Sequence, residues 1–413
     1  MSSEAIYRDE VDEIKGIKGW TLIYGRRKVG KTFLIKNFLE YDVFFRVNRD
    51  GSISAEKFLI STINNMDDFS RTVHELLSKG NTVVIDEFQR LPELILEKIS
   101  QAHPNGKFIL SGSSMRVIKK ISGSKSPLLG LTMQYKLGLI KPVNILRELS
   151  KELDIIQAIE IAPYLADAWT IPFYKKENDS AKSIYELLRY SKLTIPALVG
   201  EIFTEEERSF TKVYEAVLRL IGSREWNYKN IASLLAARKV IENADSSLII
   251  PYIKNMVEMG LVEELPVFSS KKKMYRLASP IMEAFYYLDD KYNFEETDVS
   301  FKESEPAIES LRNFAIQNFI ADLFAAEFGG RKEYYVSASN ELDFIITMRN
   351  KPVLVGEVKW GKYSLGDVKK FEEKSAFVGA ERVFITKKKK EARIGNVKIL
   401  DAEDILKMTR KKL

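Results

Sequence analysis

Residues 25–32 are Gly-Arg-Arg-Lys-Val-Gly-Lys-Thr, which fits the phosphate-binding loop pattern G-x-x-x-x-G-K-[ST]. The apolar residues 20–24 before the loop predict a buried strand, and residues 33–39 after it have helical spacing. In this order, backbone N–H groups and a helix N-terminus can surround a phosphate. We therefore expect a nucleotide site, with ATP as the ligand; the alternative is a chance glycine turn. The residues expected to contact the nucleotide here are Gly25, Arg26, Arg27, Lys28, Val29, Gly30, Lys31, Thr32 and Phe33.

Within this loop, Lys31 is expected to reach the outer phosphates, and the hydroxyl of Thr32 is expected to bind Mg²⁺. A second signature is the β-branched run at 82–85, which ends in Asp86 and Glu87. A strand buried in a parallel sheet presents its acids only at its carboxyl end, where the phosphates lie. We expect Asp86 to hold Mg²⁺ and Glu87 to orient and deprotonate the attacking water. The alternative is a strand followed by an acidic turn.

A further strand is predicted at 107–110, followed by the polar residues Ser111, Gly112, Ser113 and Ser114. We expect Ser111 to contact the γ-phosphate. The alternative for this segment is a helix N-cap, which Ser113 or Ser114 would provide. The two interpretations are compatible because they use different serines.

The composition limits the classes of function. A chain of 413 residues predicts two or three domains, and the absence of cysteine excludes disulfides, thiolate chemistry and cysteine zinc sites. With two histidines, His74 and His103, a histidine triad or zinc site is not expected. The net charge of +6 permits a nucleic-acid partner without requiring one. We expect a cytoplasmic protein, because no apolar run has the length of a membrane span and the N-terminus lacks the pattern of a signal peptide.

Between the phosphate-binding loop and the acidic signature at 82–87, residues 42–47 predict a strand and residues 55–79 predict one or two helices. The core residues expected from the second stretch are Phe58, Leu59, Ile63, Val73, Leu76 and Leu77.

Four segments together resemble the archaeal ATPase family, AAA-type P-loop proteins related to the STAND signalling ATPases. They are residues 25–32, 85–92, 110–114 and the Ser-Pro-Leu-Leu-Gly stretch at 126–130. In that family an arginine usually follows the last segment, and this chain has Leu131 there. Arg116, Arg147 or a partner protein would then have to supply an arginine finger. The resemblance also implies a small helical lid at 136–204 and an Ile-Pro-x-Tyr element at 171–174.

Residues 205–295 predict a winged helix. Amphipathic helices are expected at 210–221, 228–238 and 247–259, followed by strands at 261–265 and 273–277 around a lysine-rich turn. The turn could contact DNA phosphates, but the third helix has Lys254 as its one basic residue, which is little for reading bases. DNA contact and packing against protein remain open alternatives.

The last module has two predicted strands, of which the first carries Asp343 and the second carries Glu357 and Lys359. Two residues apart on a strand, Glu357 and Lys359 share a face, so both carboxylates could hold a divalent metal beside the lysine. This resembles the PD-(D/E)xK restriction-endonuclease-like fold. In that fold the preceding helix usually supplies a glutamate, where this chain has Ala315, with Glu309 as the nearest substitute. Solvated salt bridges are the alternative.

The predicted fold is an α/β multi-domain protein. Its expected modules are a P-loop NTPase parallel sheet at 1–135, a helical lid at 136–204, a winged helix at 205–295 and a restriction-endonuclease-like α/β domain at 296–413. We expect an ATPase that uses ATP and Mg²⁺ and acts on DNA, with self-association left open. The alternative is a STAND-like nucleotide-driven switch whose last domain only binds DNA or a partner; a P-loop protein that binds without hydrolysis is less consistent with Glu87.

Overall fold

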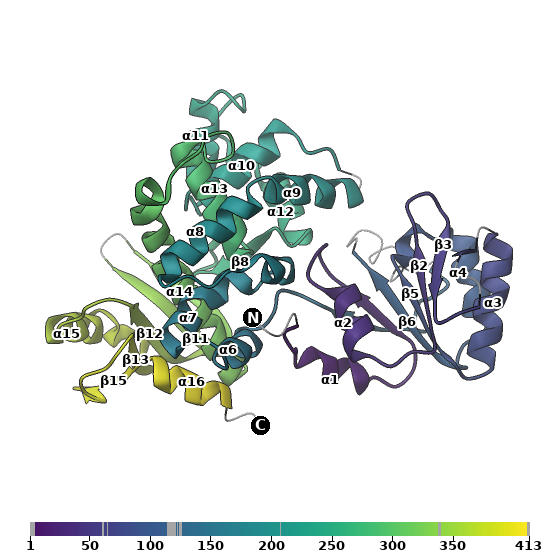
Figure 1. Cartoon of the computed structure of the whole chain (residues 1–413). Coiled ribbons are helices and arrows are strands. Elements are labelled where there is room, and N and C mark those ends of the chain that lie inside the picture. The colour runs from purple at the N-terminus through teal and green to yellow at the C-terminus, as the bar shows by residue number, and fades with distance from the viewer. Residues whose placement is uncertain are drawn as a thin grey trace. The chain divides into compact units, whose positions relative to one another are not determined.

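Tyr7–Leu139 and Leu198–Phe210 form one unit of the chain, and Met1–Ile6, Ile140–Ala197 and Thr211–Leu413 form the other. We call them the first and the second unit. The structure is a computed structural model, shown in Figure 1. It describes residues 5–59, 62–63, 65–113, 121, 123, 126–206, 208–337 and 340–410.

The first unit is built on a seven-stranded sheet of order β4-β3-β2-β5-β6-β1-β7. The five strands from β2 to β7 in this order pair in parallel, whereas β3 and β4 are antiparallel additions at one edge. The strands are β1 Thr21–Tyr24, β2 Val43–Val47, β3 Ile53–Glu56, β4 Thr62–Ile63, β5 Thr82–Asp86, β6 Lys107–Gly112 and β7 Met133–Lys136. The helices of this unit include α1 Glu10–Lys15, α2 Lys31–Phe38, α3 Met66–Ser78, α4 Glu93–Ser100 and the short 3₁₀ helix η1 Phe88–Arg90.

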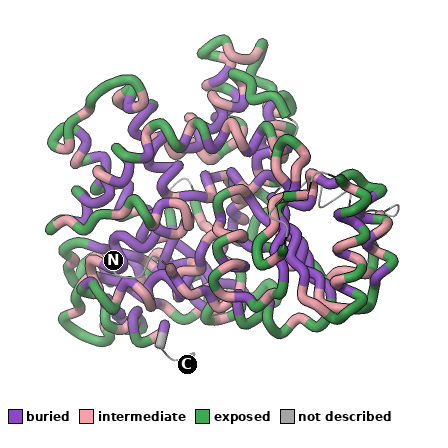
Figure 2. Tube along the Cα trace, turned by 45° about the vertical axis from the view of Figure 1, so that its right-hand side comes forward, coloured by how far each residue is buried: buried purple, intermediate pink, exposed green. Residues whose placement is uncertain are grey.

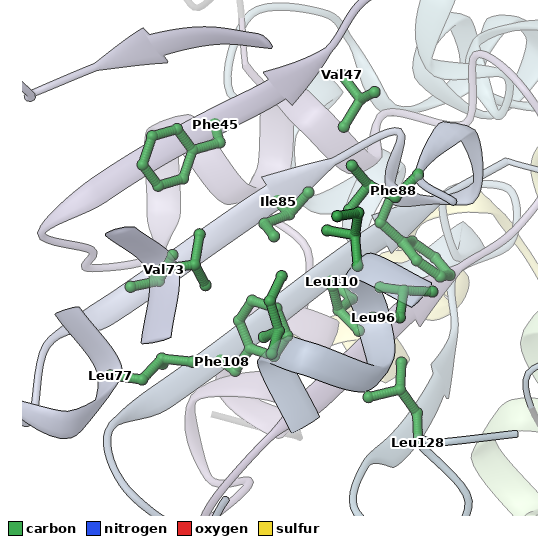
Figure 3. Packing of buried hydrophobic residues seen from close by; sticks show 14 of the residues in the cluster. Phe45, Val47, Val73, Leu77, Ile85, Phe88, Leu96, Phe108, Leu110 and Leu128 are labelled. Carbon is green, nitrogen blue, oxygen red and sulfur yellow. The ribbon is translucent and has the colours of Figure 1, made fainter. Parts of the chain in front are cut away.

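Alternating residues of the strands fill two hydrophobic layers, one on each face of this sheet. On β5, Val83 and Ile85 pack with α3 and α4, whereas Val84 packs with α1 and α2. Figure 3 shows the first of these layers, in which Phe45, Ile85, Phe108 and Leu110 face Val73, Leu77 and Leu96 of the covering helices. The inner parallel strands β1, β5 and β6 are therefore apolar on both faces, and their polar residues are confined to the ends.

The expectation of helix throughout 55–79 is wrong in its first part. Strand β3 ends at Glu56, residues 57–59 form a bend, and β4 follows at Thr62–Ile63. The helix starts only at Met66, where the side chain of Asn65 accepts hydrogen bonds from the N–H groups of Asp67 and Asp68. Leu59, expected in the core, is fully exposed. The apolar spacing that suggested a helix here arises from a pair of short edge strands.

The second unit contains the remaining helices and two sheets. Its helices are α6 Pro142–Leu149, α7 Ile155–Ile161, α8 Ser180–Ser191, α10 Lys212–Gly222, α11 Tyr228–Ala237, α12 Ile250–Glu258, α13 Pro280–Tyr292, α14 Phe301–Phe328, α15 Leu365–Lys374 and α16 Ala402–Arg410, with short 3₁₀ helices η2 Ala162–Leu165, η3 Ala168–Phe173, η4 Ser246–Leu248 and η5 Ala376–Val378. Helix α9, Thr194–Glu205, passes from this unit into the first. Its proline, Pro196, lies in the first turn, where no backbone N–H is needed for the helix. Buried residues follow the strands and inner helices of both units (Figure 2).

The segment expected to form a lid is divided between the units. Helices α6, α7 and α8 pack against α14 and α16 of the second unit, and only residues from Leu198 onward join the first. Glu160 on α7 fixes part of this packing from a buried position. Its carboxylate accepts a hydrogen bond from Trp360 Nε1 at 2.9 Å and pairs with Lys387 at 2.6 Å. The role of a lid over the nucleotide stays a prediction.

Three helices and a hairpin follow one another where a winged helix is predicted. Helices α10, α11 and α12 precede the antiparallel strands β8 Val262–Pro266 and β9 Lys273–Leu277. The third helix is shorter than expected, because η4 and Ile249 come before it and Pro251 occupies its first turn. The hairpin adjoins the next sheet, where Phe268 donates its N–H to the carbonyl of Tyr334 at 2.8 Å.

The larger sheet of the second unit has six strands in the order β10-β11-β12-β13-β15-β14. The strands are β10 Arg331–Val336, β11 Glu341–Met348, β12 Lys351–Lys359, β13 Glu381–Thr386, β14 Arg393–Ile394 and β15 Val397–Leu400. Strands β12, β13 and β15 are parallel, and the others are antiparallel. Helix α14 covers one face through the stacked rings of Phe324 and Phe344, and α15 covers the other through Val368 and Phe371.

Candidate active site

The sheet of the first unit brings the loop at 25–32 and the acids of β5 to the same edge. Strand β6 lies between β1 and β5, and all three run in parallel, so their carboxyl ends meet. In register, Tyr24 is paired with Gly112, and Asp86 is paired with Ser111. Residues that are far apart in the sequence therefore surround one point beyond the strand ends.

The loop requires its glycines for different reasons. A Cβ atom on Gly25 would lie 2.0 Å from the carbonyl oxygen of Leu137, a distance that no side chain tolerates. Gly30 has φ 96° and is the N-cap of α2, with its carbonyl accepting the N–H of Leu34 at 2.9 Å. The loop therefore turns directly into a helix N-terminus, which favours an anion there.

Lys31 is buried and folded onto its own loop. Its Nζ atom donates to the carbonyls of Gly25 at 2.8 Å and Arg26 at 3.1 Å. Burial lowers the pKa of Lys31 to about 8, although the nearby carboxylates favour the charged form. The amine is thus at the base of the loop, where the N–H groups of the helix N-terminus are also found.

Thr32 and Asp86 are in direct contact. The threonine hydroxyl donates to Asp86 Oδ2 at 2.9 Å, and the Nε atom of Arg46 lies 3.7 Å from the same oxygen. Burial raises the pKa of Asp86, and the charge of Glu87 raises it further. A hydroxyl and a carboxylate are both hard oxygen donors, and here they lie side by side. These two residues therefore fit a Mg²⁺ ion whose other ligands would be oxygens of the nucleotide and of water.

Glu87 adopts the left-handed backbone conformation, with φ 58°, directly after β5. Its Oε2 atom accepts a hydrogen bond from Gln89 Nε2 at 2.6 Å and lies 3.5 Å from Arg90. The hydroxyl of Ser113 is 3.4 Å from the same oxygen. The carboxylate is therefore held by its neighbours directly after Asp86.

Ser111 is buried beside Asp86, whereas Ser113, which we considered as a helix cap, approaches Glu87 and Gln89. Ser114 and Arg116 lie outside the described residues, and Arg147 lies in the second unit on α6. Sequence reasoning missed Gln89 and Ser113. The signal that could have found them is their position, two residues after a candidate acid or a candidate sensor.

Two further contacts of the loop were not expected from sequence. The guanidinium of Arg8 is buried and donates to the carbonyl of Val29 at 2.9 Å and to that of Gly138 at 3.0 Å. On the other side, Arg27 forms ion pairs with Glu201 and Glu205 of α9. Neither contact follows from local spacing, because the partners are separated by more than 20 residues. Lys28 and Phe33 are exposed at the same loop.

The second predicted constellation lies on the larger sheet of the second unit. The register that pairs Phe344 with Gly356 places Asp343 opposite Glu357, on the face covered by α15. Asp343 accepts the N–H of Val358 at 2.7 Å. Burial raises the pKa values of both carboxyls, and each carboxylate opposes ionisation of the other.

Lysines from α15 and from the motif complete this cluster differently from our expectation. Lys374 pairs with Glu357 at 2.7 Å, whereas Lys359 pairs with Asp367 at 2.7 Å. Within the described parts of the chain, no group of three or more His, Cys, Asp or Glu side chains is arranged to hold a metal. Ala315 is buried on α14, and Glu309 pairs with Arg312 at 3.5 Å. The two carboxylates offer oxygen donors to one divalent ion, and the charge of the nearby Glu341 raises the pKa of both.

Comparison with known proteins identifies the nucleotide-binding part. Residues 17–138 match the family described as an AAA domain. No curated protein matches the chain. Among solved structures, the ADPNP–ADP complexes of the Aeropyrum pernix ORC2 protein show 14% identity over 74% of this chain and 90% of that chain, with a TM-score of 0.36.

Two other archaeal structures have similar statistics. The Aeropyrum pernix ORC1 protein in complex with DNA shows 12% identity over 69% of this chain and 90% of that one, with a TM-score of 0.30. Cdc6p from Pyrobaculum aerophilum shows 10% identity over 72% and 88%, with a TM-score of 0.24. Scores in this range do not establish a shared overall fold.

The match of residues 17–138 to the AAA domain supports the prediction of an ATPase, and the fold is mixed α/β with a parallel-strand sheet, as predicted. In the part of the chain that the structure describes, no helix combines the length and the apolarity of a membrane span.

Proposed function

We propose that this chain hydrolyses ATP at the loop of residues 25–32 and uses the nucleotide to control its binding to DNA. The observation that carries the nucleotide half is the contact of Thr32 with Asp86 beside the buried Lys31. Three side chains with complementary roles toward a Mg²⁺–triphosphate meet there. We propose ATP and Mg²⁺ as the cofactors and the cytoplasm as the location.

Each residue contributes a definite step. The loop N–H groups and Lys31 hold the β- and γ-phosphates, while Thr32 and Asp86 orient their oxygens. When bound there, Mg²⁺ would neutralise charge on the phosphates. Glu87 accepts the proton of the attacking water once its carboxylate has turned from Gln89 toward the γ-phosphate. Ser111, at the end of β6, contacts the γ-phosphate, and Ser113, directly after that strand, lies beside Glu87.

The proposal for DNA rests on the three-helix element and its hairpin, which we interpret as a winged helix. The turn of the hairpin exposes Lys271, Lys272 and Lys273, and the third helix exposes Lys254. Lysines on a protruding hairpin attract phosphates without reading bases, so we propose sequence-tolerant binding that weakens as salt increases.

For the larger sheet of the second unit we propose a restriction-endonuclease-like domain. Asp343 and Glu357 would share a divalent ion, and Lys359 would stabilise the attacking water after leaving Asp367. The raised pKa values of the two acids are consistent with a site that a divalent cation would stabilise.

The test is cleavage of labelled linear, flapped and branched DNA with Mg²⁺ or Mn²⁺, with and without ATP. Asp343→Ala should abolish cleavage, whereas the matched variant Glu381→Gln on the same sheet should retain it. Stimulation of ATPase activity by DNA would support the DNA half of the proposal. Absence of both DNA binding and DNA-stimulated ATPase activity would overturn that half.

A second function is favoured by one observation. Both motif carboxylates and Lys359 already have partners. Lys374 neutralises Glu357, Asp367 holds Lys359, and Asp343 accepts the N–H of Val358. A domain arranged in this way could bind DNA or a partner without cleaving, in a nucleotide-driven switch. Light scattering of the full chain with ADP and with a non-hydrolysable ATP analogue would identify the switch by nucleotide-dependent self-association.

A further inference from the structure

The C-terminal part of α9 places two carboxylates on the phosphate-binding loop. Glu201 and Glu205 are one helical turn apart and therefore share a face. Glu201 Oε2 lies 2.6 Å from Arg27 Nε, and Glu205 pairs with the same guanidinium. Glu201 also pairs with Arg49, which follows β2. These residues all belong to the first unit.

The contact is partly shielded from solvent, which strengthens it. The side chains of Arg27 and Glu205 are 20% and 13% exposed. Charged pairs with this degree of burial are screened less than surface pairs. The charge of Glu205 also acts on the nearby Lys31, whose pKa it raises against the effect of burial. The helix therefore contacts the loop where two of its cations lie.

We propose that the segment of α9 with Glu201 and Glu205 is an intramolecular latch, which a bound nucleotide must displace from Arg27. This inference rests on the nucleotide site proposed above and adds its regulation. The carboxylates and the phosphates are both anions, and both are suitable ligands for the guanidinium of Arg27. A carboxylate held near a polyphosphate repels it, so the two occupants exclude each other.

The latch lies on a helix that belongs partly to each unit of the chain. Residues 194–197 of α9 belong to the second unit and residues from Leu198 onward to the first. Release of Arg27 would free the part of α9 that contacts the loop, while the start of the same helix stays with the second unit. The nucleotide state would then be transmitted along one helix to the unit that we propose binds DNA.

The opposite role, in which the glutamates position Arg27 for the nucleotide, makes the opposite prediction. If they position it, their removal weakens nucleotide binding. If they compete, their removal tightens it. The sign of the change in affinity therefore separates the two roles.

The experiment measures the affinity of the full chain for ADP and for a non-hydrolysable ATP analogue by calorimetry. For the double variant Glu201→Gln/Glu205→Gln we expect about tenfold tighter binding of the ATP analogue. The matched control is Glu56→Gln, which removes the ion pair with Lys36 in the same unit, away from the loop, and should bind like the wild type. Arg49→Ala, which removes only the outer pair, should tighten binding by about twofold.

Hydrogen exchange of residues 198–206 provides a readout that does not depend on affinity. In the wild type, protection of these amides should fall when nucleotide binds, and in the double variant it should be low from the start. Unchanged or weaker nucleotide binding by the double variant, or protection that does not respond to nucleotide, would overturn the latch. Failure of the wild type itself to bind nucleotide would instead overturn the nucleotide site, and the latch with it.

Discussion

The two units each contain a pair of acids at a sheet, and the surroundings of the pairs differ. Asp86 and Glu87 end β5 beside a glycine loop, a threonine hydroxyl and the buried Lys31. Asp343 and Glu357 lie opposite each other on neighbouring strands, where Lys374 of α15 already neutralises one of them. The first pair lies at a phosphate-binding loop, where we propose that it meets Mg²⁺, whereas one acid of the second pair is already balanced by a lysine of the protein.

This difference shows that acids of the same type acquire their roles from the charges around them. Asp86 accepts the hydroxyl of Thr32 at 2.9 Å, and the nearest cation described there, Arg46, is farther away, at 3.7 Å from the same oxygen. Glu357 is held by an ammonium group, which a metal would have to displace or rearrange around. Four variants or conditions test this contrast, in order of decreasing expected effect.

Glu87→Gln should retain ATP binding and lower turnover by about 10²- to 10⁴-fold, because an amide cannot accept the proton of the attacking water. Phosphate release measures turnover, and calorimetry measures binding. Glu97→Gln, on the exposed side of α4, is the control and should hydrolyse normally. Wild-type turnover in Glu87→Gln would show that another group is the base.

Lys31→Ala should lower the ATPase kcat/KM by about 10²- to 10³-fold, since the loop loses the amine that reaches the outer phosphates. Lys36→Ala removes a lysine from the same helix without touching the loop, so its kinetics should remain close to those of the wild type. If the two variants behaved alike, the assignment of the nucleotide site would fail.

The pH dependence of nucleotide binding should reflect Lys31. Since burial lowers its pKa to about 8, the free protein loses this charge as pH rises above that value, whereas bound phosphate would keep the amine protonated. Nucleotide affinity should therefore fall by up to about tenfold per pH unit above 8. Calorimetry between pH 7 and pH 10 measures this, and a flat profile would mean that Lys31 keeps its proton without a ligand.

Lys374→Met tests the second pair of acids. Loss of the ammonium group leaves Glu357 beside Asp343 without its counter-charge, and the free energy of unfolding should fall by about 1–3 kcal/mol at pH 8. The loss should shrink at lower pH. Both carboxyls have raised pKa values, so they become neutral at a higher pH than ordinary carboxyls and then need no counter-charge. Urea titrations at pH 8 and at the lower pH measure the free energy of unfolding, with Lys370→Met on the same helix as the control. An equal loss at both would show that the effect is packing.

Local patterns predicted the elements of the nucleotide site, and distant contacts were beyond them. The loop, β5 and β6 are contiguous stretches whose apolar runs and flanking residues give their type and order. The partners of Arg8 and Arg27 come from segments more than 20 residues away, and nothing in the spacing of charges indicates them. The stretch at 55–79 failed because two short strands can imitate helical spacing.

The second constellation shows the same limit more sharply. The period of a strand predicted that Glu357 and Lys359 share a face, and the register places Asp343 opposite. That α15 would bring Lys374 and Asp367 to this face depends on how a helix packs over the sheet. Such packing is decided by the whole hydrophobic layer, which includes Val368 and Phe371.

Gly25 carries a consequence for how this protein could change over generations. Its missing side chain is required by the carbonyl of Leu137, 2.0 Å from where a Cβ atom would lie, whatever the loop binds. A descendant that no longer bound nucleotide would be free to replace Lys31 or Glu87, yet selection for folding would still retain this glycine. Among such descendants, the lysine and the glutamate would record the lost activity, and the first glycine would not.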